Sequence, residues 1–182
     1  MNNKKNKLKD LLNYYLKKKF TVIDAGVNKG HFLTTKIGLK NINKAIMIDQ
    51  IKNKALNKLI DKKFKYLDVA LGNKKKKTSF YIHSNSHSEW SSLHKIYKKS
   101  PYNTLYKKFL IKPIRKTVYQ DSLDNILNKN NVIKNYLGSD SKKIDILKID
   151  CQSNTLPILI GGNKTFKTNK IKMIIAAINP YY

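Results

Sequence analysis

The chain has 182 residues, of which 38 are lysine or arginine and 11 are aspartate or glutamate, so the formal net charge is +27. This length is typical of one domain with its own core, and the single cysteine, Cys151, excludes an internal disulfide and cysteine-based zinc sites. The longest apolar run, Met173–Ile178, is far shorter than the roughly 20 residues that span a bilayer, and the first residues lack the apolar core of a signal peptide. We expect a cytoplasmic protein with a single domain over residues 1–182.

The basic excess is almost entirely lysine, because Arg115 is the only arginine and Glu89 the only glutamate. Positive charge favours anionic partners such as nucleic acid. Proteins that bind nucleic acid rely on arginine, however, whose planar guanidinium forms paired bonds with phosphate and guanine. The composition therefore favours a solvated basic surface, with an anionic partner as the alternative.

Residues 1–19 are predicted to form an amphipathic helix, since leucines and Tyr15 recur at helical spacing between Lys4 and Lys19. The apolar face is short and lacks tryptophan. Packing on the domain is therefore favoured over binding to a membrane surface.

Short apolar runs then alternate with helical stretches. The runs 20–24 and 45–49 end in Asp24 and Asp49, and residues 64–71 are predicted to be a third strand interrupted by Asp68. Helices are predicted over about 30–39 and 51–60. Such alternation, with strands that are apolar throughout, is typical of an α/β fold in which helices cover both faces of a parallel sheet.

The middle of the chain breaks this pattern. A turn over 72–77 and a strand over 78–82 precede residues 84–116, which are polar, basic and aromatic without a clear period. Long segments of this kind are usually lids or binding loops, and we expect a lid or a substrate-side insertion.

Regular structure resumes in the last third of the chain. The predicted elements are a short strand at 117–119, a helix over 122–128, a polar connector to Lys143, a strand over 144–150, a helix over 153–160 and a strand over 171–178. The fourth strand of the parallel sheet therefore ends in another acid, Asp150.

A glycine-rich turn, Asp24-x-Gly26-x-Asn28-x-Gly30, directly follows the first strand. Glycines allow a tight turn and close approach of a ligand, and the start of the next helix offers N–H groups to an anion. An aspartate before this turn suits a ligand with a cationic and an anionic end, and Asp49 can accept both hydroxyls of a ribose. An amino acid joined to a ribose describes S-adenosylmethionine. The alternative is a tight strand-to-helix turn without a ligand.

Six motifs occur in order along the chain. They are Val22-Ile-Asp-Ala-Gly-Val-Asn-Lys-Gly30, Leu71-Gly72, Ser91-Ser-Leu93, Ser122-Leu-Asp-Asn-Ile-Leu127, Ile146-Leu-Lys-Ile-Asp150 and Leu156-x-Ile158-Leu159-x-Gly161. Together they resemble the FkbM family of S-adenosylmethionine-dependent methyltransferases from about residue 21 to 179. The resemblance implies a class I, Rossmann-like methyltransferase fold and methyl transfer to an oxygen of a sugar, a glycan or another small acceptor.

The resemblance also implies roles for the residues at the strand ends. The methionine end of S-adenosylmethionine would lie on the turn after Asp24, the ribose on Asp49, and the adenine near Asp68 or Ala70. The predicted cofactor contacts are Asp24, Gly26, Val27, Asn28, Gly30, Asp49, Gln50, Asp68 and Ala70. Lys148 and Asp150 are the predicted catalytic residues, because they would lie where the methyl donor and the acceptor meet.

The chain departs from the family pattern near this site. The family commonly has Asp-Val-Glu-Gly where this chain has Asp150-Cys-Gln-Ser153, and glutamine cannot act as a general base. We expect the C-terminal strand hairpin of such folds to be missing, which would leave an open sheet edge for a homo-oligomer contact. The alternative function is a catalytically degenerate methyltransferase fold whose basic surface binds RNA or an anionic glycan.

Two further clusters lie around the expected lid. His83, His87, Glu89 and His94 have metal-binding side chains, but the serine-rich sequence between them is poor helix sequence, so we expect no metal site. Aromatic residues alternate with lysines from Trp90 to Phe109, a pattern that suits stacking on a nucleic-acid strand. Packing of the lid on the domain is the favoured interpretation.

Overall fold

The computed structural model describes residues 10, 19–83, 91–95, 113–138, 144–168 and 171–178. The predicted N-terminal helix and most of the predicted lid at 84–116 lie outside the described residues. Within the described ranges, no helix has the length and apolar character needed to cross a membrane.

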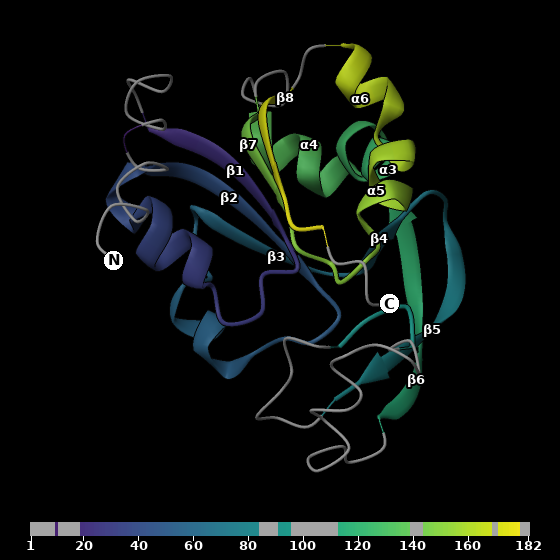
Figure 1. The fold of residues 1–182 in the computed structure, drawn as a ribbon. Helices are drawn as coiled ribbons and strands as arrows, with labels where there is room; N and C mark the ends of the chain where they lie inside the picture. Colours follow the sequence, from purple (N-terminus) through teal and green to yellow (C-terminus); the bar gives the residue numbers. More distant parts are fainter. Residues whose placement is uncertain are drawn as a thin grey trace.

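Five parallel strands form the central sheet in the order β3-β2-β1-β7-β8 (Figure 1). They are β1 (Phe20–Ala25), β2 (Ile42–Asp49), β3 (Phe64–Asp68), β7 (Ile144–Ile149) and β8 (Ile171–Ala176). The strand order reverses between β1 and β7, so their carboxyl ends border the crevice where open α/β sheets bind ligands. The predicted Rossmann-like α/β fold is confirmed.

Alternate residues of the central strands pack into two separate cores, which is why these strands are apolar throughout. Val22, Met47 and Ile146 face one core, whereas Ile23 and Leu147 face the other. All these side chains are buried. A strand covered on both faces shows no alternation of polar and apolar residues.

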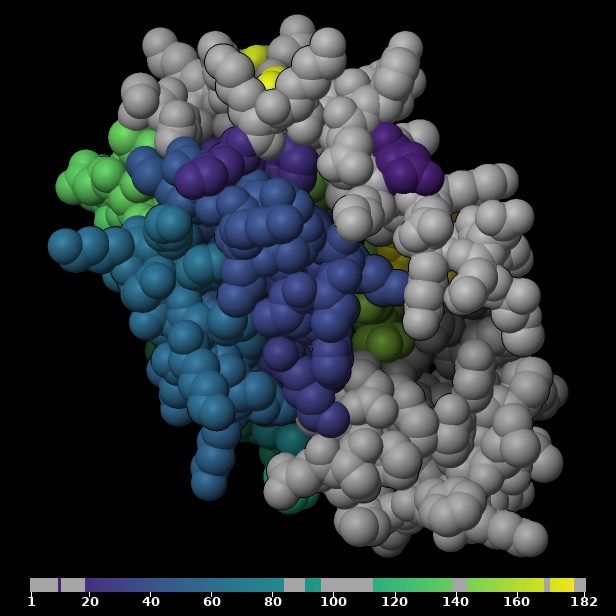
Figure 2. Space-filling view, turned by 90° about the vertical axis from the view of Figure 1, so that its left-hand side faces the viewer, coloured from purple at the N-terminus to yellow at the C-terminus, as the bar shows by residue number. Residues whose placement is uncertain are grey.

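Short helices cover the two faces of the sheet. On the first face lie the π-helix η1 (Phe32–Ile37), the 3₁₀-helix η2 (Leu39–Asn41) and the 3₁₀-helix η3 (Lys54–Lys58). On the second face lie α3 (Leu123–Asn128), α4 (Asn131–Leu137), α5 (Thr155–Gly161) and α6 (Asn163–Lys167). Figure 2 views the molecule from the side where η1 to η3, in blue, form the surface.

The helices on the first face are shorter than the predicted ranges 30–39 and 51–60. In η1, the hydroxyl groups of Thr34 and Thr35 donate to the carbonyl groups four residues earlier, and such bonds weaken and bend a helix. The helix then ends at Gly38, whose φ of +84° lies outside the helical region.

A second sheet of three strands, in the order β4-β6-β5, lies beside the carboxyl ends of the first. Its strands are β4 (Ala70–Gly72), β5 (Lys76–Ile82) and β6 (Ile114–Ser122). The prediction of one strand over 64–71 is therefore wrong, because the chain leaves the main sheet at Val69 and enters the second. The strand that precedes the turn pairs with β6 and not with β5.

Three other elements differ from their predicted extent. The strand expected at 117–119 extends over 114–122, where most side chains are exposed and the apolar signal is correspondingly weak. The connector expected before Lys143 contains α4, and α6 follows the helix that was predicted over 153–160. In α4, only Ile133 and Leu137 are buried, so the apolar spacing that indicates a helix extends over a single turn.

Candidate functional site

The carboxyl ends of β1, β2 and β7 border a cavity of about 90 Å³. Residues at the ends of these strands line it together with residues of β4, β5 and the segment 91–93. The predicted site residues that line this cavity are Gly26, Asn28, Asp49, Gln50, Ala70 and Asp150. The cavity therefore lies at the position that the strand-end motifs indicate.

A wider groove of about 480 Å³ lies next to this cavity and shares Gly26, Asn28 and Asp150 with it. Val27 lines this groove, as do Lys148 and three exposed side chains from the turn and η1, namely Lys29, His31 and Lys36. The glycine-rich turn thus contributes to both spaces. A ligand longer than either space can lie along the two of them past Asp150.

Gly26 allows the turn to pass directly over the end of β7. Its φ is +75°, and a Cβ atom there would lie 2.1 Å from the carbonyl oxygen of Asp150. The backbone N–H of Gly26 also donates to the carbonyl of Ile48 at 2.9 Å. The end of β1 is therefore held between its two neighbouring strands, and a side chain at this position would force them apart.

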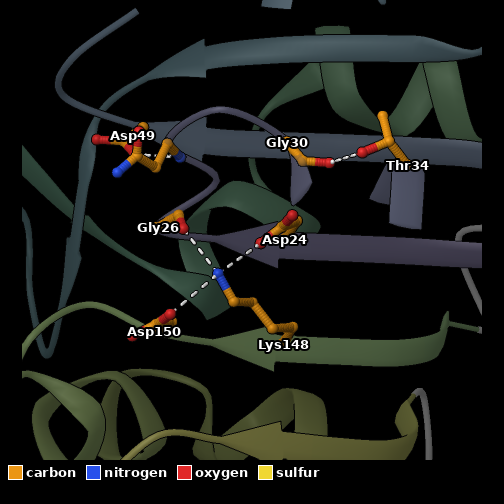
Figure 3. A network of polar contacts seen from close by, with 8 residues as sticks. Asp24, Gly26, Gly30, Thr34, Asp49, Lys148 and Asp150 are labelled. Atoms are coloured by element: carbon orange, nitrogen blue, oxygen red, sulfur yellow. Dashed lines mark hydrogen bonds and ion pairs between the residues drawn. The ribbon is translucent and has the colours of Figure 1, made fainter. Parts of the chain in front are cut away.

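Gly30 has a packing role in the structure. A Cβ atom on Gly30 would approach the side chains of Leu59 and Leu56 at 3.0 and 3.1 Å, and its carbonyl accepts a hydrogen bond from the Thr34 hydroxyl (Figure 3). It lines neither the cavity nor the groove. The turn needs Gly30 because of the adjacent helix η3.

Asp49 presents its carboxylate to the cavity from the end of β2. Oδ2 accepts from the backbone N–H of Asn28 at 2.9 Å, and Oδ1 accepts from the N–H of Ile51 at 3.1 Å. Burial raises the pKa of Asp49, and these backbone hydrogen bonds partly offset the shift. Each oxygen keeps a further acceptor site, so the carboxylate can accept hydrogen bonds from two hydroxyl groups of a ligand.

The two neighbours of Asp49 in the predicted set differ in their position. With its amide oxygen toward β4, Gln50 accepts hydrogen bonds from the N–H groups of Val69 and Ala70, both at 2.8 Å. Asp68 is paired in register with Asp49 at the end of β3, but it is exposed and does not line the cavity. Of these two aspartates at strand ends, only Asp49 lines the cavity.

Asp24 and Lys148 form a buried ion pair between β1 and β7, where they are register partners (Figure 3). Lys148 Nζ lies 3.0 Å from Asp24 Oδ1, donates to the carbonyl of Gly26 at 2.7 Å, and lies 3.6 Å from Asp150 Oδ2. The side chain of Asp24 is 0% exposed, that of Lys148 12%, and that of Asp150 45%. Lys148 therefore links the predicted cofactor turn to Asp150.

Burial determines the protonation properties of this pair. Loss of solvation raises the pKa of Asp24 to about 6, although the Lys148 ammonium lowers it. Burial lowers the pKa of Lys148, but the carboxylates of Asp24 and Asp150 outweigh it and raise the pKa above its ordinary value. Lys148 is therefore a permanent cation at neutral pH.

Two polar residues outside the predicted set, Ser92 and Asn154, also line the cavity. The hydroxyl of Ser92 donates to the carbonyl of Gln152, and Asn154 bonds Nε2 of His94 through Oδ1 at 3.1 Å and the carbonyl of Leu71 through Nδ2. The motif Ser91-Ser-Leu93 was the available signal. These bonds hold the segment 91–95 against the end of β7.

The remaining candidates do not form a site within the described residues. Among those residues, no group of three or more histidine, cysteine, aspartate or glutamate side chains is placed so that it could hold a metal ion. Of the four predicted metal-binding candidates, His83 and His94 lie within the described residues, whereas His87 and Glu89 lie outside them. Burial raises the pKa of Cys151, so its thiol is neutral at physiological pH.

Comparisons with known proteins place the chain in a family. No curated protein matches it, and no solved structure matches it. The model of the methyltransferase FkbM domain matches residues 24–181, which include the end of β1, the glycine-rich turn, Asp49 and all later strands. The chain belongs to the FkbM methyltransferase domain family.

Proposed function

We propose that this protein is an S-adenosylmethionine-dependent O-methyltransferase that acts on a sugar, a glycan or a similar small hydroxylated acceptor. The observation that carries the proposal is the position of Asp49 and the Gly26 turn, which face one cavity at the point where the strand order reverses. Membership of the FkbM methyltransferase family supports the same reaction class.

The residues present fit the nucleoside half of the donor. Asp49 has acceptor capacity for the two ribose hydroxyls, and Val69, Ala70 and Leu71 supply a wall beside it for the adenine. A cavity of about 90 Å³ is smaller than the roughly 300–1,000 Å³ of ligand sites. We therefore expect the donor to extend from this cavity into the groove of about 480 Å³, which shares Gly26, Asn28 and Asp150 with it.

Asp150 lines both the cavity and the groove, and it is the residue that we assign to the acceptor. The sulfonium supplies an electrophilic methyl group: its carbon–sulfur bond breaks as the carbon–oxygen bond forms, and the acceptor hydroxyl loses a proton. The half-exposed carboxylate of Asp150 can orient this hydroxyl and accept the proton. Lys148 Nζ lies 3.6 Å from Asp150 Oδ2, so its ammonium group is beside the acceptor position.

Calorimetric titration with S-adenosylhomocysteine tests the donor site. Asp49→Asn is expected to weaken binding about 10-fold or more, because hydrogen bonds to a charged group contribute roughly 1.5–3 kcal/mol. Asp68→Asn is the matched control, since Asp68 ends the neighbouring strand in register with Asp49 but does not line the cavity. We expect the control to bind within twofold of the unmodified chain.

Two outcomes would overturn the proposal. Absence of both heat and thermal stabilisation at millimolar ligand would exclude donor binding, and equal losses in the two variants would exclude the assigned site. The first outcome favours the alternative of a basic module that binds polyanions, which salt-dependent retention on a phosphate polymer would then show. Transfer of a labelled methyl group to a pool of sugars and glycans tests the acceptor class.

A further inference from the structure

The carboxylate of Asp24 is already paired with an ammonium group of the protein itself, that of Lys148. Apart from Lys148, no N–H or O–H group of the described residues donates to either of its carboxylate oxygens. A ligand ammonium would have to displace Lys148 from Asp24 and from the carbonyl of Gly26. The displaced lysine would lose two short contacts, and the ligand would lose the hydration of its own charge.

We propose that Lys148 takes the place of the donor's ammonium group at Asp24, and that the amino-acid end of the donor is recognised through its carboxylate in the adjacent groove. This inference rests on the proposed donor binding, and it replaces the role that the sequence suggested for Asp24. Asp24 then serves to hold Lys148 in position.

The charge of the groove supports recognition of an anion. Lys29, Lys36 and Lys148 line it, and Asp150 is the one acidic side chain among its described lining residues. The distance of 3.6 Å from Lys148 Nζ to Asp150 is longer than a hydrogen bond. Nζ contacts Asp24 and Gly26 at shorter distances, so a ligand oxygen within hydrogen-bond distance of Nζ would compete only with the longer contact to Asp150.

The position of the groove supports the same assignment. The groove shares Gly26, Asn28 and Asp150 with the cavity that Asp49 lines, and Asp49 does not line the groove itself. A chain that extends from the ribose past Asp150 therefore enters a basic environment. A carboxylate is stabilised there, whereas an ammonium group is repelled by the lysines.

Two analogues of S-adenosylhomocysteine separate the two ends of the amino acid. One lacks the amino group and the other lacks the carboxylate. By calorimetry, we expect the analogue without the amino group to bind within about threefold of the parent compound, and the analogue without the carboxylate to bind at least 10-fold more weakly. An equal or larger loss on removing the amino group would overturn the inference, as would equal affinity of all three compounds.

Variants of the groove provide a second measurement. Lys36→Met is expected to weaken the parent compound two- to threefold without affecting the analogue that lacks the carboxylate, since Lys36 is an exposed charge on η1. Lys62→Met removes the same charge from an exposed position outside the groove and should change neither. Equal effects of the two variants would contradict a local carboxylate site.

Lys148→Met tests the exchange at Asp24 directly. Without Lys148, Asp24 is free to pair with a ligand ammonium, so the preference should reverse in favour of the analogue that lacks the carboxylate. An unchanged preference in a folded variant would overturn the inference, and if the variant does not fold, the Lys36→Met pair still decides. Failure of the parent compound and both analogues to bind would refute the proposed donor site itself.

Discussion

Replacing Gly26 by alanine tests the close contact between the ends of β1 and β7. The new Cβ would lie 2.1 Å from the carbonyl oxygen of Asp150 and 2.8 Å from its carbonyl carbon, whereas real Cβ atoms stay beyond about 3.0 Å from such atoms. Both contacts are backbone atoms, so no side chain can move to make room. The two strands must therefore separate by roughly 1 Å at their carboxyl ends.

The expected destabilisation has two parts. A non-glycine residue at a φ of +75° costs of order 1–3 kcal/mol. Separation of the strands weakens the 2.9 Å bond from the Asp150 N–H to the Ala25 carbonyl and the 2.7 Å bond from Lys148 to the Gly26 carbonyl, each worth about 1 kcal/mol. We expect a total loss of about 3–5 kcal/mol, a large share of the roughly 5–15 kcal/mol that stabilises a domain.

Gly38→Ala is the matched control for this experiment. Gly38 also has a positive φ, +84°, but the nearest atom to its Cβ position is Asn41 Nδ2 at 3.7 Å, so only the conformational cost applies. Urea unfolding at pH 7 measures both variants. We expect Gly26→Ala to lose about 2 kcal/mol more than Gly38→Ala, and equal losses would refute the contact between Gly26 and Asp150.

Three further predictions concern buried or capping polar groups. The pKa of Asp24 is raised from 3.8 to about 6 by burial, so the folded state binds this proton more tightly than the unfolded state does. The stability of the unmodified chain relative to Asp24→Asn should therefore fall by about 2 kcal/mol between pH 4 and pH 7. Urea titrations at four pH values check this, and a relative stability that rises with pH would contradict it. Asn154→Ala should cost about 1–3 kcal/mol, because it leaves the Leu71 carbonyl and the His94 ring without their shared partner; a loss below about 0.5 kcal/mol in urea unfolding would show that water replaces the amide. Asp124→Ala should lower the stability by about 1–2 kcal/mol, because Asp124 accepts hydrogen bonds from the N–H groups of Lys164 and Thr165 at the start of α6. Thermal unfolding measures this loss, with Asp121→Ala as a comparison. The Asp124→Ala variant should bind S-adenosylhomocysteine as the unmodified chain does.

Local patterns were sufficient for the main sheet and for the turn after β1. Strands buried on both faces are apolar throughout. All six residues of β1 are buried, β2 has four consecutive buried residues, and four of the six residues of β7 are buried. Asp24 near the end of β1, Asp49 at the end of β2 and Asp150 directly after β7 mark the carboxyl edge of the sheet. The glycine at position 26 marks the close approach of two strands, which no other residue type allows at that φ.

The second sheet could not be predicted in the same way. A Cβ atom at Gly72 would lie 2.3 Å from the side chain of Gln120, a residue of the distant strand β6. In β6 itself most side chains are exposed and few are apolar. The break at Val69, where the chain passes from one sheet to the other, carries no turn residue. Strand pairing with a distant segment, and not local propensity, determines these elements.

The sequence by itself determined the α/β architecture, the parallel strands, the family and the position of Asp49, because each depends on residues that are close along the chain. Only the tertiary structure decided that Asp24 pairs with Lys148, 124 residues later, that Gly30 packs on η3, and that the crevice is divided into a cavity and a basic groove. The physical reason is that the charge environment of a side chain depends on which strands are neighbours in the sheet. From the sequence, Asp24 is suited to pair with a ligand ammonium group. In the folded chain β7 lies beside β1, and Asp24 is already paired with Lys148.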